Sequence, residues 1–167
     1  SLRDLVLKNC FGSINVTKLI RGENKQVSPG QDWVFETSTE DGTNRIVNGA
    51  EGKDLANHVT DETNEQGNFG RKLNQKNQTP QTAQRVKIVE HQQSGFVMQP
   101  YSDNKNATCT ATVFDGKNNK WKTEHVSVEN VDDAAKPGFT VAVPPSAIVN
   151  CSVVNARASK LSLTCLL

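Results

Sequence analysis

Three polar residues occupy positions that strand-like alternation assigns to an apolar interior. Residues two apart in a β-strand point to the same face of the sheet. By this rule Lys18, Glu90 and Asn155 each share a face with apolar or cysteine side chains: Ile14, Val16, Ile20, Val86, Ile88, Cys151 and Val153. Burying an ionisable group is costly unless a partner compensates it. A cation, an anion and an amide are available to one another here, so we expect the three to share one buried site.

These three residue types could form an amide bond without an external cofactor. Burial disfavours the charged form of a lysine, which leaves Lys18 with a neutral amine that can attack a carbonyl. Burial also favours the protonated form of a glutamate, so Glu90 could polarise the Asn155 carbonyl and carry protons to the departing ammonia. Confinement makes the amide a workable electrophile. The predicted product is an isopeptide bond between Lys18 and Asn155, with Glu90 as the catalytic residue.

β-Strands would position these residues. Alternation broken by turn residues about every ten positions is typical of strands. The predicted strands are Ser13–Ile20, Asp32–Ser38, Asn68–Leu73, Arg85–His91, Gly95–Gln99, Thr108–Phe114, Trp121–Val128, Phe139–Val143 and Ile148–Asn155. A short helix is expected within 52–62, where Leu55 and Val59 lie four residues apart.

The fold class expected is an all-β antiparallel sandwich or partly open barrel, immunoglobulin-like or prealbumin-like. The chain has 167 residues, the size of one domain. The strand pattern predicts about seven to nine strands in it. Sandwiches of this kind commonly place their first and last strands side by side, which would bring Lys18 and Asn155 together.

Composition and charge exclude several classes of function. The net charge is +1, which provides no basic footprint for nucleic acid and no polybasic surface for a membrane. Apolar runs are only a few residues long, so no transmembrane helix is expected. The four cysteines lack C-x-x-C spacing and the three histidines are scattered, which argues against a metal site. The cysteines are either buried free thiols or disulfide-bonded, and we favour a disulfide.

The two ends of the chain resemble each other. The segments Ile14–Ile20 and Leu161–Leu167 share a pattern, with Cys165 at the place of Lys18. Tandem repeats would produce this similarity, and chance likeness between short β segments is the alternative. The repeat interpretation divides the chain into the tail of a preceding unit or a linker, a prealbumin-like β-sandwich domain, and the start of a following unit or a linker: 1–11, 12–157 and 158–167.

The chain resembles the collagen-adhesin B-type, or prealbumin-like, domains of Gram-positive surface adhesins and pilins. The matching segments are Ile14–Lys18, Thr60–Glu62, Gly67–Phe69, Val86–Glu90, Gly95-Phe96 and Val153–Asn155. Members of that family carry a lysine on the first strand, a glutamate before a turn and an asparagine on the last strand, and they join the lysine to the asparagine. The resemblance implies these roles for Lys18, Glu90 and Asn155. The turn Gln92–Phe96 departs from the family pattern, because it lacks the usual proline and has phenylalanine for tyrosine.

The resemblance also implies a disulfide, a location and partners. The segment Ala107–Ala111, together with Cys151, is similar to family variants in which a disulfide joins two late strands, which implies a Cys109–Cys151 bond. Cys10 and Cys165 would belong to the flanking units, and their pairing is left open. The location implied is extracellular, on the cell surface or anchored to the cell wall. Neighbouring domains of the same surface protein and a host extracellular ligand are the partners implied, with no nucleic acid, no membrane contact and no cofactor.

The function implied is that of a structural stalk or repeat domain of a bacterial surface adhesin or fimbrial protein. The alternative is a β-sandwich module without the cross-link, which binds a carbohydrate or a host protein through Trp121 or the polar loop Thr39–Asp61. A turnover enzyme is not expected, since the sequence shows no Ser/His/Asp arrangement, phosphate loop or metal cluster. The chemistry expected is one autocatalytic isopeptide formation per molecule.

Overall fold

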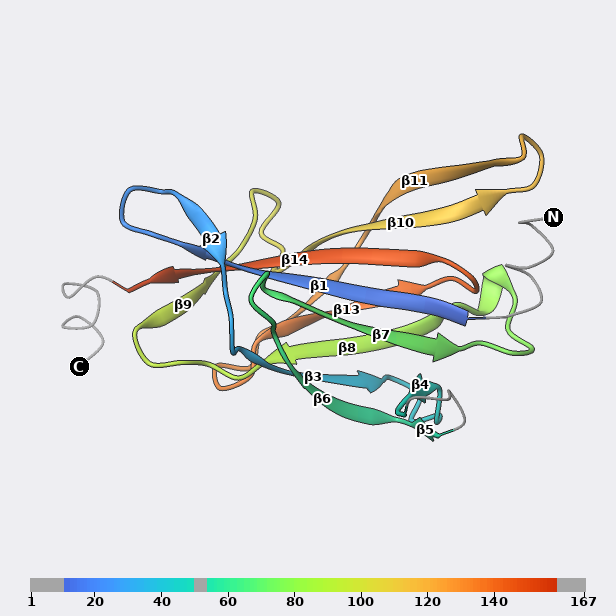
Figure 1. Ribbon diagram of the computed structural model, residues 1–167, viewed down its shortest axis with the longest axis horizontal. Helices are drawn as coiled ribbons and strands as arrows, with labels where there is room; N and C mark the ends of the chain where they lie inside the picture. Colours follow the sequence, from blue (N-terminus) through green and yellow to red (C-terminus); the bar gives the residue numbers. More distant parts are fainter. Residues whose placement is uncertain (1–10, 50–53, 159–167) are drawn as a thin grey trace.

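The computed structural model describes residues 11–49 and 54–158, which form two stacked β-sheets (Figure 1). The larger sheet has nine strands: β1 (Phe11–Arg21), β2 (Val27–Pro29), β4 (Ile46–Val47), β5 (Leu55–Ala56), β7 (Asn68–Asn74), β9 (Phe96–Gln99), β10 (Thr108–Asp115), β11 (Lys120–Val126) and β14 (Ile148–Arg157). The smaller sheet has five: β3 (Val34–Thr39), β6 (His58–Glu62), β8 (Gln84–Glu90), β12 (Glu129–Val131) and β13 (Gly138–Val143). One turn of 3-10 helix, Pro80–Thr82, precedes β8. The all-β sandwich predicted from the sequence is confirmed.

The first and last strands of the sandwich lie side by side at the centre of the larger sheet. The strand order there is β11-β10-β14-β1-β7-β4-β5, with β2 beside β1 and β9 beside β14. The smaller sheet has the order β12-β13-β8-β3-β6. β1 and β14 run parallel, from the pair Ser13 and Ile148 to the pair Arg21 and Ala156. The adjacency matches the expectation, whereas the parallel direction departs from a purely antiparallel sandwich.

The helix expected within 52–62 is wrong. Its described part forms β5 and β6 instead, and β6 pairs with β3 along the edge of the smaller sheet. Val59, whose spacing from Leu55 suggested a helix, is buried from this strand. Sheet pairing outweighs a weak local helical signal. The described residues also hold more strands than the seven to nine expected, because β6 replaces the helix and four further strands, β2, β4, β5 and β12, are only two or three residues long.

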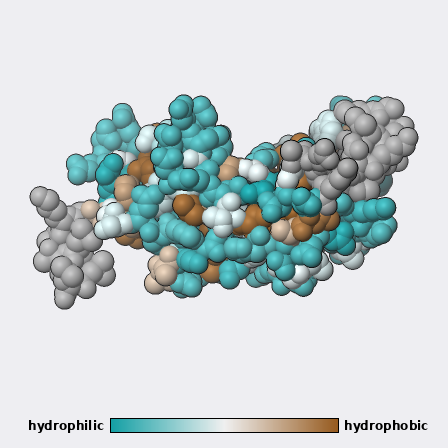
Figure 2. All heavy atoms as spheres, turned by 60° about the horizontal axis from the view of Figure 1, so that its bottom comes forward, coloured by the Kyte–Doolittle hydropathy of each residue, from teal (hydrophilic) through white to brown (hydrophobic). Residues whose placement is uncertain are grey.

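Alternating side chains from both sheets fill one apolar core. In β1, buried and partly exposed residues alternate from Gly12 to Lys18, which places every second side chain between the sheets. Figure 2 shows a mostly hydrophilic face in which hydrophobic residues appear as a band along the long axis. Among the fully buried side chains, three that are polar or charged approach one another: Lys18, Glu90 and Asn155.

Candidate functional site

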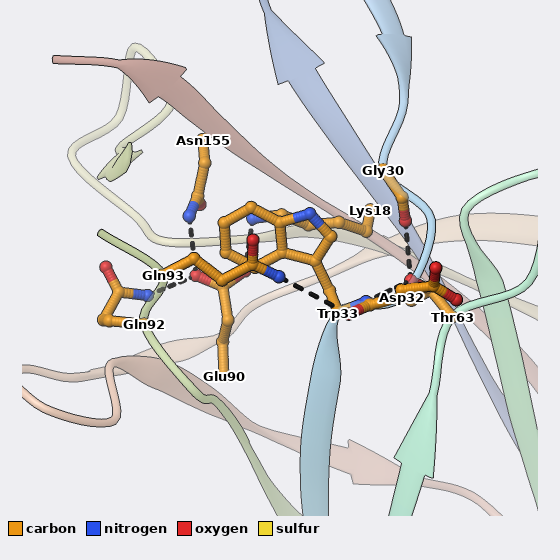
Figure 3. Close-up of polar contacts among 9 residues, drawn as sticks. All are labelled: Lys18, Gly30, Asp32, Trp33, Thr63, Glu90, Gln92, Gln93 and Asn155. Atoms are coloured by element: carbon orange, nitrogen blue, oxygen red, sulfur yellow. Dashed lines mark hydrogen bonds and ion pairs between the residues drawn. The ribbon is translucent and has the colours of Figure 1, made fainter. Parts of the chain in front are cut away.

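Lys18, Glu90 and Asn155 meet in the interior through one carboxylate (Figure 3). The ammonium of Lys18 donates a hydrogen bond to Glu90 Oε1. Asn155 Nδ2 donates to the second oxygen, Glu90 Oε2, at 2.9 Å. All three residues are 0 % exposed. The structure therefore brings together the three residues that the sequence placed on inward strand faces.

The two sheets contribute different parts of this site. Lys18 on β1 and Asn155 on β14 belong to the larger sheet, whereas Glu90 ends β8 in the smaller sheet. In the parallel register Lys18 pairs with Val153, so Asn155 lies one inward-facing position further along β14. The lysine and the asparagine are diagonal neighbours on one face. The glutamate reaches them from across the core, so the site can form only when both sheets are assembled.

Two glycines admit the Lys18 side chain and fix its backbone. The amide N–H of Lys18 donates to the carbonyl of Gly67 at 2.7 Å, and its carbonyl accepts from the N–H of Gly30 at 2.9 Å. A Cβ at Gly30 would lie 2.8 Å from Lys18 Cγ. At Gly67 φ is +77°, and a Cβ there would lie 2.4 Å from the Lys18 carbonyl oxygen. A side chain at either position would push the lysine out of place.

An aromatic ring covers the Lys18 amine. The centroid of the Trp33 ring is 4.3 Å from Lys18 Nζ, within the range of a cation–π contact. Trp33 is held by Thr63, whose hydroxyl accepts a hydrogen bond from the backbone N–H of Trp33 at 2.9 Å and donates to the Gly30 carbonyl at 2.6 Å. Phe96 packs edge-on against the same indole, with ring centroids 5.2 Å apart. The buried Trp33 ring, packed against the partly buried Phe96, thus replaces water on one side of the amine.

Burial decides the protonation of Lys18. Desolvation lowers the pKa of Lys18 from 10.5 to about 8, against the opposing charge and hydrogen bond of Glu90. A pKa near 8 makes the neutral amine accessible at ordinary pH. The lysine is therefore closer to a nucleophile than a solvated lysine is.

Only the nitrogen end of the Asn155 amide has a hydrogen-bond partner among the described residues. Its Nδ2 binds Glu90, but its buried Oδ1 has no hydrogen-bond partner among residues 11–49 and 54–158. A buried carbonyl without a partner costs about 1–3 kcal/mol. A proton placed on Glu90 could be donated to this oxygen after rotation of the amide, which would make its carbon more electrophilic.

Gln92 is a member of the site that the sequence reasoning missed. Its side-chain amide donates to Glu90 Oε2, the oxygen that Asn155 also contacts. Gln92 is partly exposed, so it stands between the buried carboxylate and the surface. The available signal was its spacing, because a residue two positions after Glu90 shares its face in an extended chain. Trp33 lay within the predicted strand Asp32–Ser38, on the same face as Phe35, but this spacing did not indicate a contact with Lys18.

The other predicted site residues form a cross-strand disulfide. Cys109 on β10 and Cys151 on β14 are directly opposite each other and are bonded, with their Cα atoms 4.1 Å apart. Cys151 shares the inward face of β14 with Asn155. Cys10 and Cys165 lie outside the described residues, as do most of the predicted flanking segments 1–11 and 158–167.

Two further findings concern metal and membrane. Within 11–49 and 54–158, no group of three or more His, Cys, Asp or Glu side chains is arranged to hold a metal ion. His58 and His91 instead contact the carboxylate of Glu36 on the outer surface. In the same described ranges no helix is long and apolar enough to cross a membrane.

Comparison with known proteins gives structural matches alone. No protein-family model matches the chain, and no curated protein matches its sequence. The pilus-presented adhesin Spy0125 (Cpa) is similar at 8% identity and a TM-score of 0.41, over 90% of this chain and 28% of the adhesin. A streptococcal ancillary pilin is similar at 8% identity and a TM-score of 0.35, over 91% of this chain and 64% of the pilin. The chain thus spans less than two thirds of either protein, and neither match shows the B-type family or an isopeptide bond.

Dioxygenases are also among the similar structures. One is 3-chlorocatechol 1,2-dioxygenase from Rhodococcus opacus 1CP, at 8% identity and a TM-score of 0.36, over 87% of this chain and 60% of the enzyme. Three other dioxygenases match at TM-scores of 0.27 to 0.34. These matches contradict the prediction that the chain is not an enzyme, because the similar structures include enzymes as well as adhesins. Fold similarity does not separate enzymes from adhesins, so only the chemistry of the site can distinguish them.

Proposed function

We propose that this chain is a structural domain of a surface adhesin or pilin-type protein, held together by an isopeptide bond between Lys18 Nζ and Asn155 Cγ. The observation that carries the proposal is the contact of two fully buried groups, an amine and an amide, with one buried carboxylate. Burial of a lone lysine would be unfavourable. A lysine placed beside a carboxylate and a carboxamide has the reagents for its own neutralisation.

The reaction conserves atoms and charge. Lys18 passes one proton to Glu90, which leaves a neutral amine and a protonated carboxyl group. The amine nitrogen attacks Asn155 Cγ, while the Glu90 carboxyl donates a hydrogen bond to the amide oxygen. Glu90 then takes a proton from the attacking nitrogen as its first proton moves to the departing –NH₂. The C–N bond of Asn155 breaks, ammonia leaves, and the Lys18–Asn155 amide remains beside a protonated Glu90.

The site supplies each requirement of this reaction. The lowered pKa of Lys18 favours the nucleophilic form. The hydrogen bond from Asn155 to Glu90 aligns the amide with the group that handles the protons. The aromatic cover of Trp33 keeps competing water away from the amine. The product is uncharged, so bond formation removes the buried ammonium.

The position of the bond suits a domain that carries load. β1 and β14 are neighbours along the long axis, and the described chain begins at one end of this axis and finishes at the other (Figure 1). A force that separates the two ends would pass from β1 to β14 through a covalent amide, without parting hydrogen-bonded strands. By analogy with disulfides, closing a loop on the order of a hundred residues stabilises the fold by about 4–5 kcal/mol.

The wider setting proposed is an oxidising, extracellular one. The Cys109–Cys151 disulfide supports it, because such bonds persist mainly outside the reducing cytosol. We propose a place on the cell surface or cell wall, with residues 12–157 as one domain between neighbouring domains of the same protein.

The test is the intact mass of the reduced, denatured protein. Loss of ammonia makes the cross-linked chain lighter than its sequence mass by about 17 Da, and prior reduction removes the roughly 2 Da effect of a disulfide. Lys18→Met and Glu90→Gln should restore the full mass. Lys72→Met changes an exposed lysine on β7 and should keep the deficit. A cross-linked peptide pair containing Lys18 and Asn155 should appear after digestion. An unmodified mass in the wild-type protein would falsify the cross-link.

A further inference from the structure

The outward side of the larger sheet carries uncharged hydrogen-bonding side chains across four adjacent strands, β11, β10, β14 and β1. We call this region the amide–hydroxyl face. It is defined by six residues that are partly or fully exposed: Asn15, Thr17, Thr110, Thr112, Thr123 and Asn150. The strand register makes them neighbours, since Asn150 lies between Asn15 and Thr110, and Thr112 lies opposite Thr123. The face therefore extends continuously from the sheet edge to its centre.

This face contains no ionised side chain in its three inner strands. The segments 13–17, 108–114 and 148–152 hold no Asp, Glu, Lys or Arg, although 22% of the whole chain is charged. On β11 the lysines and the glutamate take the alternate positions, where Lys122 and Glu124 pair at 2.7 Å, and His125 lies on the face opposite Thr110. The outward side of the smaller sheet differs, since Glu36 and Lys136 form an ion pair there. An uncharged face is thus a local property of the larger sheet.

An exposed aromatic pair borders the amide–hydroxyl face. Trp121 on β11 and Phe114 on β10 are register partners whose ring centroids are 5.6 Å apart at 74°. They lie two residues beyond the Thr112 and Thr123 pair, so they share its side of the hairpin. Trp121 remains 39% exposed. The edge-on contact holds the indole in one orientation while part of it faces solvent.

Hydrogen bonds within the face orient its side chains and leave further donors and acceptors for a ligand. Asn15 Nδ2 donates to Asn150 Oδ1 at 3.2 Å, and the hydroxyls of Thr112 and Thr123 are 2.9 Å apart. Each amide has two donor hydrogens and an oxygen with two lone pairs, and each hydroxyl both donates and accepts. One internal bond per group leaves donors and acceptors directed to solvent. The groups are therefore arranged before any ligand arrives, which lowers the entropic cost of binding.

Sheet stability explains only part of this arrangement. Cross-strand threonine and aromatic pairs each stabilise a hairpin by a few tenths to about 1 kcal/mol. That accounts for the pairing of Phe114 with Trp121. It does not require the outward positions within 13–17, 108–114 and 148–152 to avoid charge, and it does not require a partly exposed tryptophan at the border.

We propose that the amide–hydroxyl face binds a neutral polysaccharide. The indole of Trp121 would stack on the apolar face of one sugar ring, and the asparagine and threonine side chains would bind the hydroxyls of the following sugars. A neutral ligand matches a face whose three inner strands have no lysine or arginine there to pair with an acidic sugar. A chain of sugars matches groups repeated across strands about 4.8 Å apart. This binding role is independent of the proposed cross-link.

The test is affinity electrophoresis of the disulfide-intact chain in native gels. The gels would contain xylan, mixed-linkage β-glucan, mannan or starch, with pull-down on insoluble cellulose and chitin. At least one neutral polysaccharide should retard or capture the protein. Trp121→Ala should weaken that binding by about tenfold. Thr110→Glu, which places a charge and bulk on the face without touching the aromatic pair, should weaken it at least as much.

Control variants decide whether this face is responsible. Glu124→Gln lies on the opposite side of β11 and should bind as the wild type does. Retention of the Cys109–Cys151 disulfide and of the unfolding midpoint would show that Thr110→Glu is folded. The proposal is overturned if none of the neutral polysaccharides binds, or if Trp121→Ala and Thr110→Glu bind normally. Binding confined to acidic polymers such as alginate would also overturn it. The intact mass is unaffected by any of these outcomes.

Discussion

Two of the lysine–glutamate pairs in the described residues differ mainly in their access to water. Lys18 and Glu90 meet in the core with both side chains 0% exposed. Lys136 and Glu36 meet on the outer side of the smaller sheet, 2.7 Å apart, with side chains 48% and 17% exposed. These two pairs therefore bring the same functional groups together in the core and on the surface. The comparison separates what a lysine–glutamate pair does from what burial adds to it.

The surface pair is an ordinary ion pair with one well-supported carboxylate. Glu36 accepts hydrogen bonds from Lys136, His91 and His58, and these lower its pKa from 4.5 to about 2. In the buried pair the largest effect is desolvation, which lowers the pKa of Lys18 to about 8. These hydrogen bonds thus hold the outer carboxylate in its ionised form, whereas the loss of solvent moves Lys18 towards its neutral, reactive form. Burial, rather than the choice of residues, makes the inner pair a candidate for chemistry.

Replacing each lysine in turn should give the largest contrast between the two pairs. Lys18→Met removes the proposed cross-link, and the free energy of unfolding should fall by about 4–5 kcal/mol. Lys136→Met removes a partly solvated ion pair and should cost less than about 1 kcal/mol. Denaturant unfolding at neutral pH, with the disulfide intact, measures both. Similar losses in the two variants would show that burial and cross-linking add nothing to the free energy of unfolding.

Opening the cover of the buried pair should have the next largest effect. Trp33→Ala removes the ring 4.3 Å from Lys18 Nζ and should destabilise the fold by about 3 kcal/mol. Water admitted to the amine should also lower the cross-linked fraction seen by intact mass. Trp121→Ala is the matched control on the surface and should leave that fraction unchanged. A fully cross-linked Trp33→Ala protein would contradict the idea that water exclusion activates the lysine.

The pH response of the surface pair should be the smallest effect. The folded-state pKa of Glu36 is depressed, so its stabilising contribution is present above pH 4.5 and is lost as the pH falls towards 2. Glu36→Gln should remove about 1 kcal/mol of stability at pH 6 and little near pH 2. Urea unfolding of the wild type and the variant at both pH values tests this. A difference that stays constant with pH would mean that Glu36 stabilises by packing alone.

Local sequence patterns predicted the buried site because each of its three residues breaks the alternation of apolar and polar side chains in its strand. Lys18, Glu90 and Asn155 are polar at positions where the apolar pattern demands a core residue, and burial confirms each position. Alternation also located nine of the strands, including β1, β8 and β14. It could not locate β4 or β5, because two residues are too few to show a period. The all-β class could therefore be predicted, but the full strand inventory could not.

The other features of the site depend on contacts that local sequence patterns cannot predict. Trp33 reaches Lys18 through a loop that Thr63 holds in place. The parallel direction of β1 and β14 follows from the path of the whole chain between them. Long-range geometry, and not residue type, decides these features.

The disulfide on β14 has a topological consequence when it is combined with the proposed amide. Cys109 and Cys151 both lie between Lys18 and Asn155 in the chain, so the smaller covalent ring is contained within the larger one. A single cut by a protease anywhere from Lys18 to Asn155 would open a ring without releasing a fragment. Two cuts placed between Cys109 and Cys151 would be needed to release a piece of β11. The domain would survive nicking as one connected molecule, a property suited to a protein exposed to secreted proteases.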